Sequence, residues 1–214
     1  RFDLMGVLDI ETMNQAREAL VKLKPDIILY GEGWTGKDSV MPADQRALKV
    51  NVSKMPEYGM FSDDIRDSVK GHVFYYDQLG FADGGTGKEN DIRYAVTGAV
   101  KHPQVDYDKY TYTAEGAWAV RPGNSINYVS CHDNYTLWDR YEISSPEDSI
   151  DILKRKNMLS AAIVFTSQGV PFFLQGEEFG RTKPIEGSDD RSENSYNLPL
   201  YTNSIKYDRA EKFK

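Results

Sequence analysis

Apolar segments of strand length recur along this chain, and each of them runs into a cluster of polar residues. These predicted strands cover residues 1–5, 27–30, 58–61, 126–131 and 170–175. Where helix-like segments separate such strands, the pattern indicates a parallel α/β sheet or barrel. In a (β/α)₈ barrel the carboxyl ends of the strands carry the active site, so we expect the polar clusters to meet at one edge of the sheet.

The segments between the predicted strands are of two kinds. The spacing of apolar residues predicts helices over 10–24, 91–100 and 150–167, with irregular stretches over 35–57 and 101–123. The continuous apolar run at 27–30 is typical of a strand that is buried on both faces. A doubly wound open sheet is the alternative to a barrel, but no G-x-G-x-x-G motif follows a predicted strand, which makes that fold less favoured.

Composition limits the classes of molecule that the chain is expected to bind. The formal net charge is −7, and no long cluster of lysine and arginine is present, which argues against nucleic-acid binding and fits a neutral substrate. Cys131 is the only cysteine, so an internal disulfide is excluded. No apolar stretch reaches the length of a membrane span, and no membrane partner is predicted. Whether the protein is cytoplasmic or secreted is left open, as is its oligomeric state.

Three carboxylates at the ends of predicted strands suit glycoside hydrolysis: Asp3, Glu32 and Asp133. That reaction needs one ionised carboxylate and one carboxyl group that holds a proton. Arg1 lies two residues before Asp3, on the same face of an extended strand, and therefore favours the ionised form of Asp3. Glu32 stands between two glycines and close to Trp34, where partial desolvation favours the protonated form.

The sequence His132-Asp133-Asn134 adds groups that can hydrogen-bond sugar hydroxyls. Trp34 and Tyr135 have flat rings that suit stacking on glucose, although a role in the core is equally compatible with the sequence. A metal site at His132 and Asp133 is weakly supported, because the three histidines lack metal-ligand spacing. Taken singly, R-F-D also fits a surface ion pair, G-E-G-W a tight turn and H-D-N a helix cap.

The motifs together resemble the sequence signatures of the α-amylase superfamily in their pullulanase form. The signatures are carried by "RFDLMG", "YGEGW" and "VSCHDNYTLWD", and further likeness lies in "MFSDDIRDSVKG", "SQGVPFFLQGEEF" and "NSYN". The resemblance implies that Asp3 is the nucleophile, Glu32 the acid/base and Asp133 the stabiliser of the transition state. It also implies that Arg1 and His132 contact the substrate. Leu200 stands where the resemblance leads us to expect an acidic residue.

This resemblance implies a retaining hydrolase of α-1,6-glucosidic bonds in pullulan, amylopectin or limit dextrins. It requires no organic cofactor, and calcium is a possible ligand. Residues 1–214 are then expected to be the C-terminal part of a catalytic (β/α)₈ barrel, truncated at both ends and holding roughly strands four to eight. The alternatives are an isoamylase-like or other enzyme of the superfamily, and a catalytically inactive glucan-binding fragment.

Overall fold

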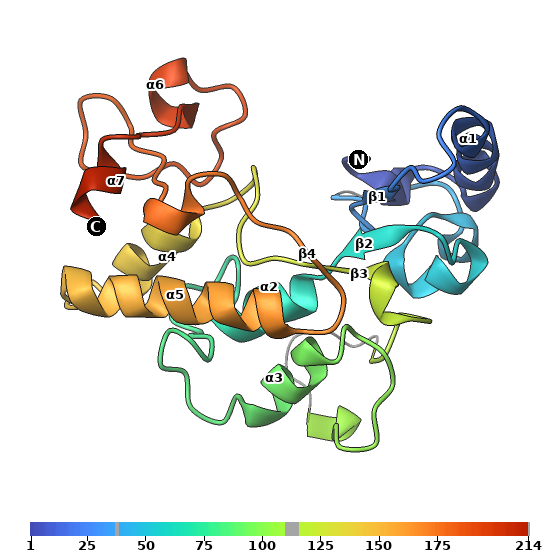
Figure 1. The fold of residues 1–214 in the computed structure, drawn as a ribbon, viewed down its shortest axis with the longest axis horizontal. Coiled ribbons are helices and arrows are strands. Elements are labelled where there is room, and N and C mark those ends of the chain that lie inside the picture. Colours follow the sequence, from blue (N-terminus) through green and yellow to red (C-terminus); the bar gives the residue numbers. More distant parts are fainter. Residues whose placement is uncertain (37–38, 110–115, 214) are drawn as a thin grey trace.

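A single parallel sheet organises the chain in the computed structural model, which describes residues 1–36, 39–109 and 116–213. Its four strands follow one another in chain order, with Tyr30 beside Gly59, Met60 beside Ser125 and Ile126 beside Val170 (Figure 1). The strands are β1 (Tyr30–Gly31), β2 (Gly59–Phe61), β3 (Ser125–Asn127) and β4 (Val170–Pro171). The predicted α/β class with a parallel sheet is confirmed.

α-Helices lie between β2 and β3 and between β3 and β4 along the chain, and 3₁₀ turns lie between β1 and β2. The α-helices are α1 (Ile10–Leu23), α2 (Asp63–Lys70), α3 (Glu89–Val96), α4 (Leu137–Ser144), α5 (Ile150–Thr166), α6 (Leu200–Asn203) and α7 (Arg209–Lys212). Short 3₁₀ turns are η1 (Met5–Val7), η2 (Ala43–Gln45), η3 (Lys49–Lys54), η4 (Tyr107–Lys109), η5 (Pro122–Asn124) and η6 (Glu177–Phe179). The parts of the predicted irregular stretches at 37–38 and 110–115 lie outside the described residues.

Two of the predicted helices have the local signals that begin a helix. Asp9 caps α1 by accepting a hydrogen bond from the Thr12 amide at 2.7 Å, and Ser149 caps α5 in the same way. The boundaries of both helices agree with the prediction to within one residue at each end. The third prediction, 91–100, corresponds to α3, which begins two residues earlier and ends at Val96.

Four of the strand predictions need correction. Of the predicted strand 126–131, only residues 126–127 lie in β3, which ends at Asn127. Residues 1–5 form only a single parallel bridge, Phe2 with Gly31, because Leu4 adopts a left-handed backbone (φ 46°) that ends the extended conformation. The segment 27–30 is not buried on both faces, since Ile28 is 72% exposed while Leu29 is buried. The segment 170–175 has only two residues in β4, at the edge of the described sheet, and both are exposed.

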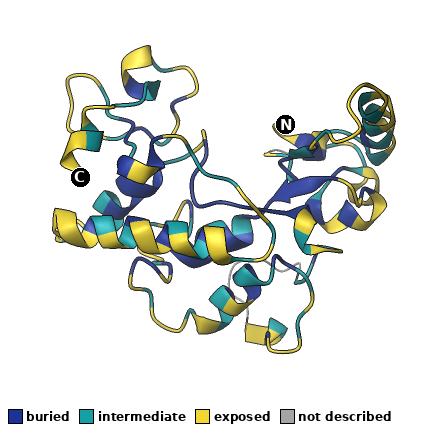
Figure 2. Cartoon of the chain, viewed as in Figure 1, coloured by how far each residue is buried: buried dark blue, intermediate teal, exposed yellow. Residues whose placement is uncertain are grey.

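The sequence analysis did not predict α2 or α4. Six of the eight residues of α2 are buried, among them the charged Asp64, Asp67 and Lys70, so the usual alternation of apolar and polar faces is hidden. In α4 the buried residues likewise include Asp139 and Arg140. Both helices pack with α5 in one hydrophobic cluster. Figure 2 colours the buried stretches of the chain dark blue.

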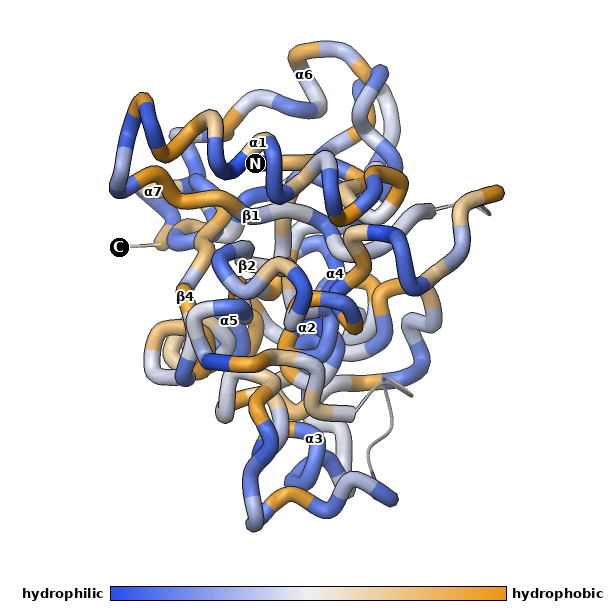
Figure 3. Tube along the Cα trace, turned by 90° about the vertical axis from the view of Figure 1, so that its right-hand side faces the viewer, coloured by the Kyte–Doolittle hydropathy of each residue, from blue (hydrophilic) through white to orange (hydrophobic). Residues whose placement is uncertain are grey.

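The described residues form two larger hydrophobic clusters, the other of which includes Met5, Met13 and Tyr58, and a smaller third one at the carboxyl ends of the strands. Phe61, Ile126, Tyr128 and Cys131 form its buried part, and Phe61 stands edge-on to Tyr128 with ring centroids 4.9 Å apart. Hydrophobic residues occur along the trace in short runs between polar ones (Figure 3). In the described part of the chain, none of the helices combines the length and the apolar character of a membrane span.

Candidate active site

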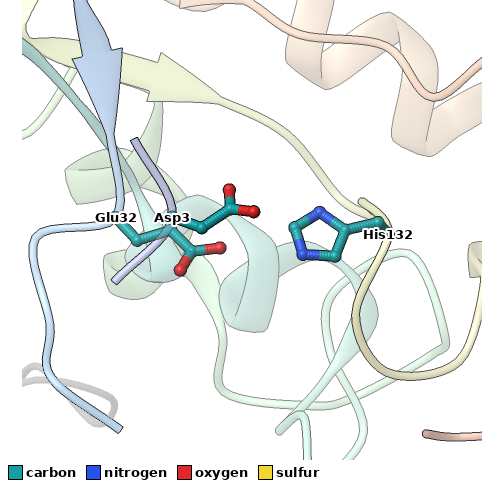
Figure 4. A group of neighbouring side chains, drawn as sticks. All are labelled: Asp3, Glu32 and His132. Carbon is teal, nitrogen blue, oxygen red and sulfur yellow. The ribbon is translucent and has the colours of Figure 1, made fainter. Parts of the chain in front are cut away.

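The predicted site residues converge from three segments that are far apart in the sequence. Asp3 follows the bridge made by Phe2, Glu32 follows β1, and His132 lies in the loop after β3. One ligand atom from each of these three side chains lies within 4.8 Å of the others. Figure 4 shows the two carboxyl groups side by side and the imidazole ring facing them. The expectation that the polar clusters meet at the carboxyl ends of the strands is confirmed.

Arg1 joins all three groups. Its Nε lies 3.0 Å from Asp3 Oδ1, and its Nη2 lies 3.5 Å from Glu32 Oε1 and 2.5 Å from His132 Nδ1. The guanidinium also stands over the Phe61 ring, 4.9 Å from its centroid, and donates to the sulfur of Cys131 at 3.3 Å. A planar cation with five donors can hold several acceptors at fixed angles, so Arg1 sets the geometry of the cluster.

The contact with Arg1 determines the tautomer of His132. A guanidinium can only donate hydrogen bonds, so Nδ1 of the imidazole must be the acceptor. The proton of the neutral ring then lies on Nε2, which is 3.4 Å from Oδ1 of Asp133. His132 and Asp133 are both partly exposed, with free polar edges for a ligand.

Glu32 is the buried member of the cluster, with 4% of its surface exposed. Burial raises the pKa of its carboxyl group, and the negative charges of Asp3 and Asp133 raise it further. The Leu4 amide opposes this by donating to Oε2 at 2.7 Å. Leu4 itself has a left-handed backbone (φ 46°), the kind of local strain that is found at functional sites.

A cavity of about 790 Å³ opens beside this cluster. Four of the predicted site residues line it: Glu32, Trp34, Asp133 and Asn134. Arg1, Asp3 and His132 adjoin it through their contacts with Glu32. The predicted residue Tyr135 is not part of the lining and stands edge-on to Tyr76, with ring centroids 5.5 Å apart.

Other residues of the cavity were missed by the sequence analysis as site residues. Its walls also contain Phe61, Arg66, Lys70, Phe74, Tyr128, Glu193 and Asn194. Arg66 donates to the Tyr128 hydroxyl at 3.0 Å and pairs with Asp67 at 2.6 Å. The charged run "SDDIRD" at the end of β2 was the available signal, because it too follows a buried strand.

A metal ion could in principle use Asp3, Glu32 and His132 as ligands. The Arg1 guanidinium already contacts all three side chains, so a cation would have to compete with it. Two carboxylates and one imidazole also offer fewer oxygens than the six to eight that calcium usually takes. Calcium therefore stays a prediction from the resemblance, without a defined place in this cluster.

The fold and the site together define an α/β protein that carries paired carboxylates at the carboxyl ends of parallel strands, as glycosidases do. The chain is 36% identical over 214 residues to pullulanase of Bacillus subtilis (strain 168), an alignment that spans all of this chain and 27% of that protein. No protein-family model matches the chain.

Solved structures give the same result. Pullulanase type I from Bacillus subtilis str. 168, complexed with maltose, matches with a TM-score of 0.87 and 35% identity, over 100% of this chain and 28% of that one. Pullulanase from Paenibacillus barengoltzii, complexed with maltohexaose and alpha-cyclodextrin, matches with a TM-score of 0.84 and 41% identity, over 100% of this chain and 30% of that one.

The chain is therefore a homologue of part of the pullulanases, the starch-debranching glycosidases of the α-amylase superfamily. It spans somewhat more than a quarter of the length of these relatives. Its parallel sheet with helices matches part of the pullulanase structures, in agreement with the predicted partial barrel.

Proposed function

We propose that this chain supplies the catalytic residues of a retaining glycoside hydrolase that cleaves α-1,6-glucosidic bonds in pullulan, amylopectin or limit dextrins. The observation that carries the proposal is the pair of carboxylates, since oxygens of Asp3 and Glu32 lie within 4.8 Å of each other. Retaining glycosidases hold their carboxyl groups about 5–5.5 Å apart, whereas inverting enzymes keep them about 6.5–9.5 Å apart to admit a water molecule.

The two carboxyl groups differ in the way that the reaction needs. Asp3 is 63% exposed, and its Oδ1 lies 3.0 Å from Nε of Arg1, which orients the group that attacks in this proposal. Glu32 is buried, and its raised pKa favours a carboxyl group that can give up a proton. An Asp3 oxygen forms a bond to the anomeric carbon while the bond from that carbon to the glycosidic oxygen breaks. The glycosidic oxygen takes the proton of Glu32.

The resulting β-glucosyl ester on Asp3 is then hydrolysed. Glu32, now ionised, takes a proton from water, and the water oxygen attacks the anomeric carbon and displaces Asp3. Two inversions leave the product in the α configuration. Asp133 and His132 offer hydrogen bonds to the hydroxyls of the sugar, which strengthen as the ring gains positive charge.

The remaining substrate contacts follow from the cavity. Trp34 offers a flat ring and Asn134 an amide at the wall shared with Glu32. Tyr135 follows Asn134 in the chain, but its ring packs against Tyr76 and does not line the cavity, so the proposal gives it no direct contact with the substrate. The related pullulanase structures are complexes with maltose, maltohexaose and alpha-cyclodextrin, which supports an α-glucan as the substrate here.

The variant Asp3→Asn tests this function in the natural full-length protein. It removes the nucleophile while it keeps the size of the side chain, so we expect turnover of pullulan to be lost and binding of maltohexaose, measured by calorimetry, to be retained. Near-normal turnover would reassign the nucleophile. A wild-type protein that binds glucan without hydrolysing pullulan would favour a glucan-binding segment, and a protein that debranches amylopectin but spares pullulan would favour an isoamylase-like enzyme.

A further inference from the structure

A buried lysine holds the loop that carries Asp133. Lys183 has 2% of its surface exposed, and it follows η6 in a segment without regular secondary structure. Its Nζ donates to the backbone carbonyl of His132 at 2.5 Å and to that of Asn134 at 2.7 Å. The His132 carbonyl belongs to the peptide unit directly before Asp133, and the Asn134 carbonyl to the unit directly after Asn134, so one ammonium group holds the chain on both sides of Asp133.

The side chain of Asp133 has few contacts of its own among the described residues. It is 58% exposed, and its Oδ1 lies 3.4 Å from Nε2 of His132, whose ring is 43% exposed and is contacted at Nδ1 by Arg1. Asn134 has a left-handed backbone (φ 58°), which asparagine adopts more readily than most residues and which turns the chain sharply here. The ammonium of Lys183 holds this turn from the protein side of the loop.

Lys183 is itself anchored by a buried carboxylate in the first turn of α4. Oδ2 of Asp139 accepts a hydrogen bond from the Lys183 amide at 2.8 Å, and Oδ1 accepts one from the Thr182 hydroxyl. Asp139 is fully buried, and Arg191 balances its charge from 3.3 Å. The loop, α4 and residues 182–183 therefore form a closed ring of contacts, because α4 begins directly after the loop.

The charges around Lys183 agree with a role at the site. Burial lowers the pKa of its ammonium to about 8, against the attraction of Asp133 and Asp139, while Arg181 lowers it further. Burial of a charged group costs free energy, so such a group is rarely found in the interior unless specific partners stabilise it. A methionine of similar length would fill the same volume without that burial penalty.

We propose that Lys183 is a positioning residue that places Asp133 for the transition state by clamping the carbonyls of His132 and Asn134. This inference rests on the function proposed above, in which Asp133 stabilises that state. A lysine suits the task because its ammonium carries several donors at one point, and two carbonyl oxygens converge there.

The test is a double-mutant cycle in the natural full-length protein with pullulan as substrate. Lys183→Met keeps the aliphatic stem and removes the donors, and we expect it to lower kcat on the order of 10²-fold, with a much smaller change in KM. In an Asp133→Asn background the same substitution is expected to lower kcat no more than about 3-fold, because the residue that it positions is already disabled. Lys101→Met, at an exposed position, is the matched control and is expected to change nothing.

An equal loss in both backgrounds, or no loss in either, would overturn the proposal. Amide hydrogen exchange gives a readout that does not need activity. Lys183→Met is expected to speed exchange at residues 132–135 and to leave α5 unchanged, whereas faster exchange throughout the chain would mean a general structural role. If Lys183→Met does not fold, Lys183→Gln, which keeps an amide donor, replaces it, and failure of both to fold would likewise contradict the proposal.

The failures of the two proposals can be told apart. A wild-type protein that does not hydrolyse pullulan overturns the proposed function, and the exchange experiment then still decides whether Lys183 holds the loop. A wild-type protein that hydrolyses pullulan, together with a fully active Lys183→Met variant, overturns the clamp alone.

Discussion

Glu32 combines burial with close charged neighbours, and this combination determines when it carries a proton. If it is the general acid, Glu32→Gln should slow hydrolysis of pullulan about 10²- to 10⁴-fold, because the glycosidic oxygen then leaves without a proton. An α-maltosyl fluoride should be much less affected, because fluoride leaves as an anion. Steady-state kinetics on both substrates make the comparison, and an equal loss on both would contradict the role.

The direction of the pKa shift of Glu32 gives a second readout of the same prediction. Its pKa is raised chiefly by burial, so the protonated form persists to higher pH than in an ordinary glutamate. The kcat/KM for pullulan should therefore fall on the alkaline side as pH rises through this raised pKa. This fall in kcat/KM at alkaline pH should be absent when Glu32→Gln hydrolyses α-maltosyl fluoride. If the activity of the variant still fell at alkaline pH, a titratable group other than Glu32 would be responsible.

At the level of residues, the sequence was sufficient to predict the cluster of polar residues at the site, but not the lysine that supports one of its loops. Asp3, Glu32 and His132 could be found because each ends a strand-like segment, and the carboxyl ends of parallel strands share one edge. Lys183 could not be found in this way. It lies 51 residues after His132, in no recognisable motif, and acts through backbone carbonyls that have no sequence signature.

At the level of elements, η6 contains a carboxyl group whose burial affects stability. Burial raises the pKa of Glu177 from 4.5 to about 7, although the Ser130 hydroxyl donates to one oxygen and the charge of Lys70 opposes the shift. The other oxygen has no hydrogen-bond partner within the described part of the chain. The unfolded chain would release the proton of Glu177 near pH 4.5, and the folded chain near pH 7.

The sign of the pH dependence follows from this difference. Between pH 4.5 and 7 the folded state binds more protons at Glu177, so its contribution to the free energy of unfolding falls as pH rises. Glu177→Gln removes this dependence. We expect the stability of the variant relative to wild type to increase by on the order of 3 kcal/mol from pH 4.5 to 8.

Chemical denaturation at several pH values measures that difference. Glu186→Gln, at an exposed position whose charge does not act on Glu177, is the control and should leave the pH dependence of stability as in the wild type. If the difference in stability between Glu177→Gln and wild type also stayed constant with pH, Glu177 would ionise as an ordinary glutamate.

The errors in the elements have a common physical origin. Periodicity identified α1 and α5, since these helices are long and partly exposed, but it missed α2, where charged residues are buried with their partners. The apolar run at 27–30 predicted burial on both faces, but Ile28 faces solvent in this structure. Local sequence does not report which neighbours cover a strand, so burial was the least predictable property.

At the scale of the whole molecule, several large apolar side chains are exposed along one helix. Met158 and Phe165 of α5 are 70% and 55% exposed. Exposed apolar surface promotes association, so the 214-residue chain alone should self-associate. Changing both residues to serine should shift the chain toward monomer in sedimentation velocity and leave its thermal midpoint almost unchanged, because the side chains are mostly in water already.

A conservative change on the same helix, Thr166→Ser, is the control for this prediction and should associate like the wild type. A double serine variant that loses its folded structure would show that Met158 and Phe165 are part of the core. A wild-type chain that is monomeric at high concentration would contradict the prediction directly.

The central claim is that Asp3 and Glu32 act as the close carboxylate pair of a retaining enzyme, and the stereochemistry of the first product tests it most directly. Proton NMR recorded during the first minutes of pullulan hydrolysis by the natural full-length protein distinguishes the two anomers before they interconvert. The account predicts that the newly formed reducing ends appear first as the α-anomer, because two displacements occur at the same carbon. Initial appearance of the β-anomer would mean a single displacement by water and would contradict the roles assigned to both residues.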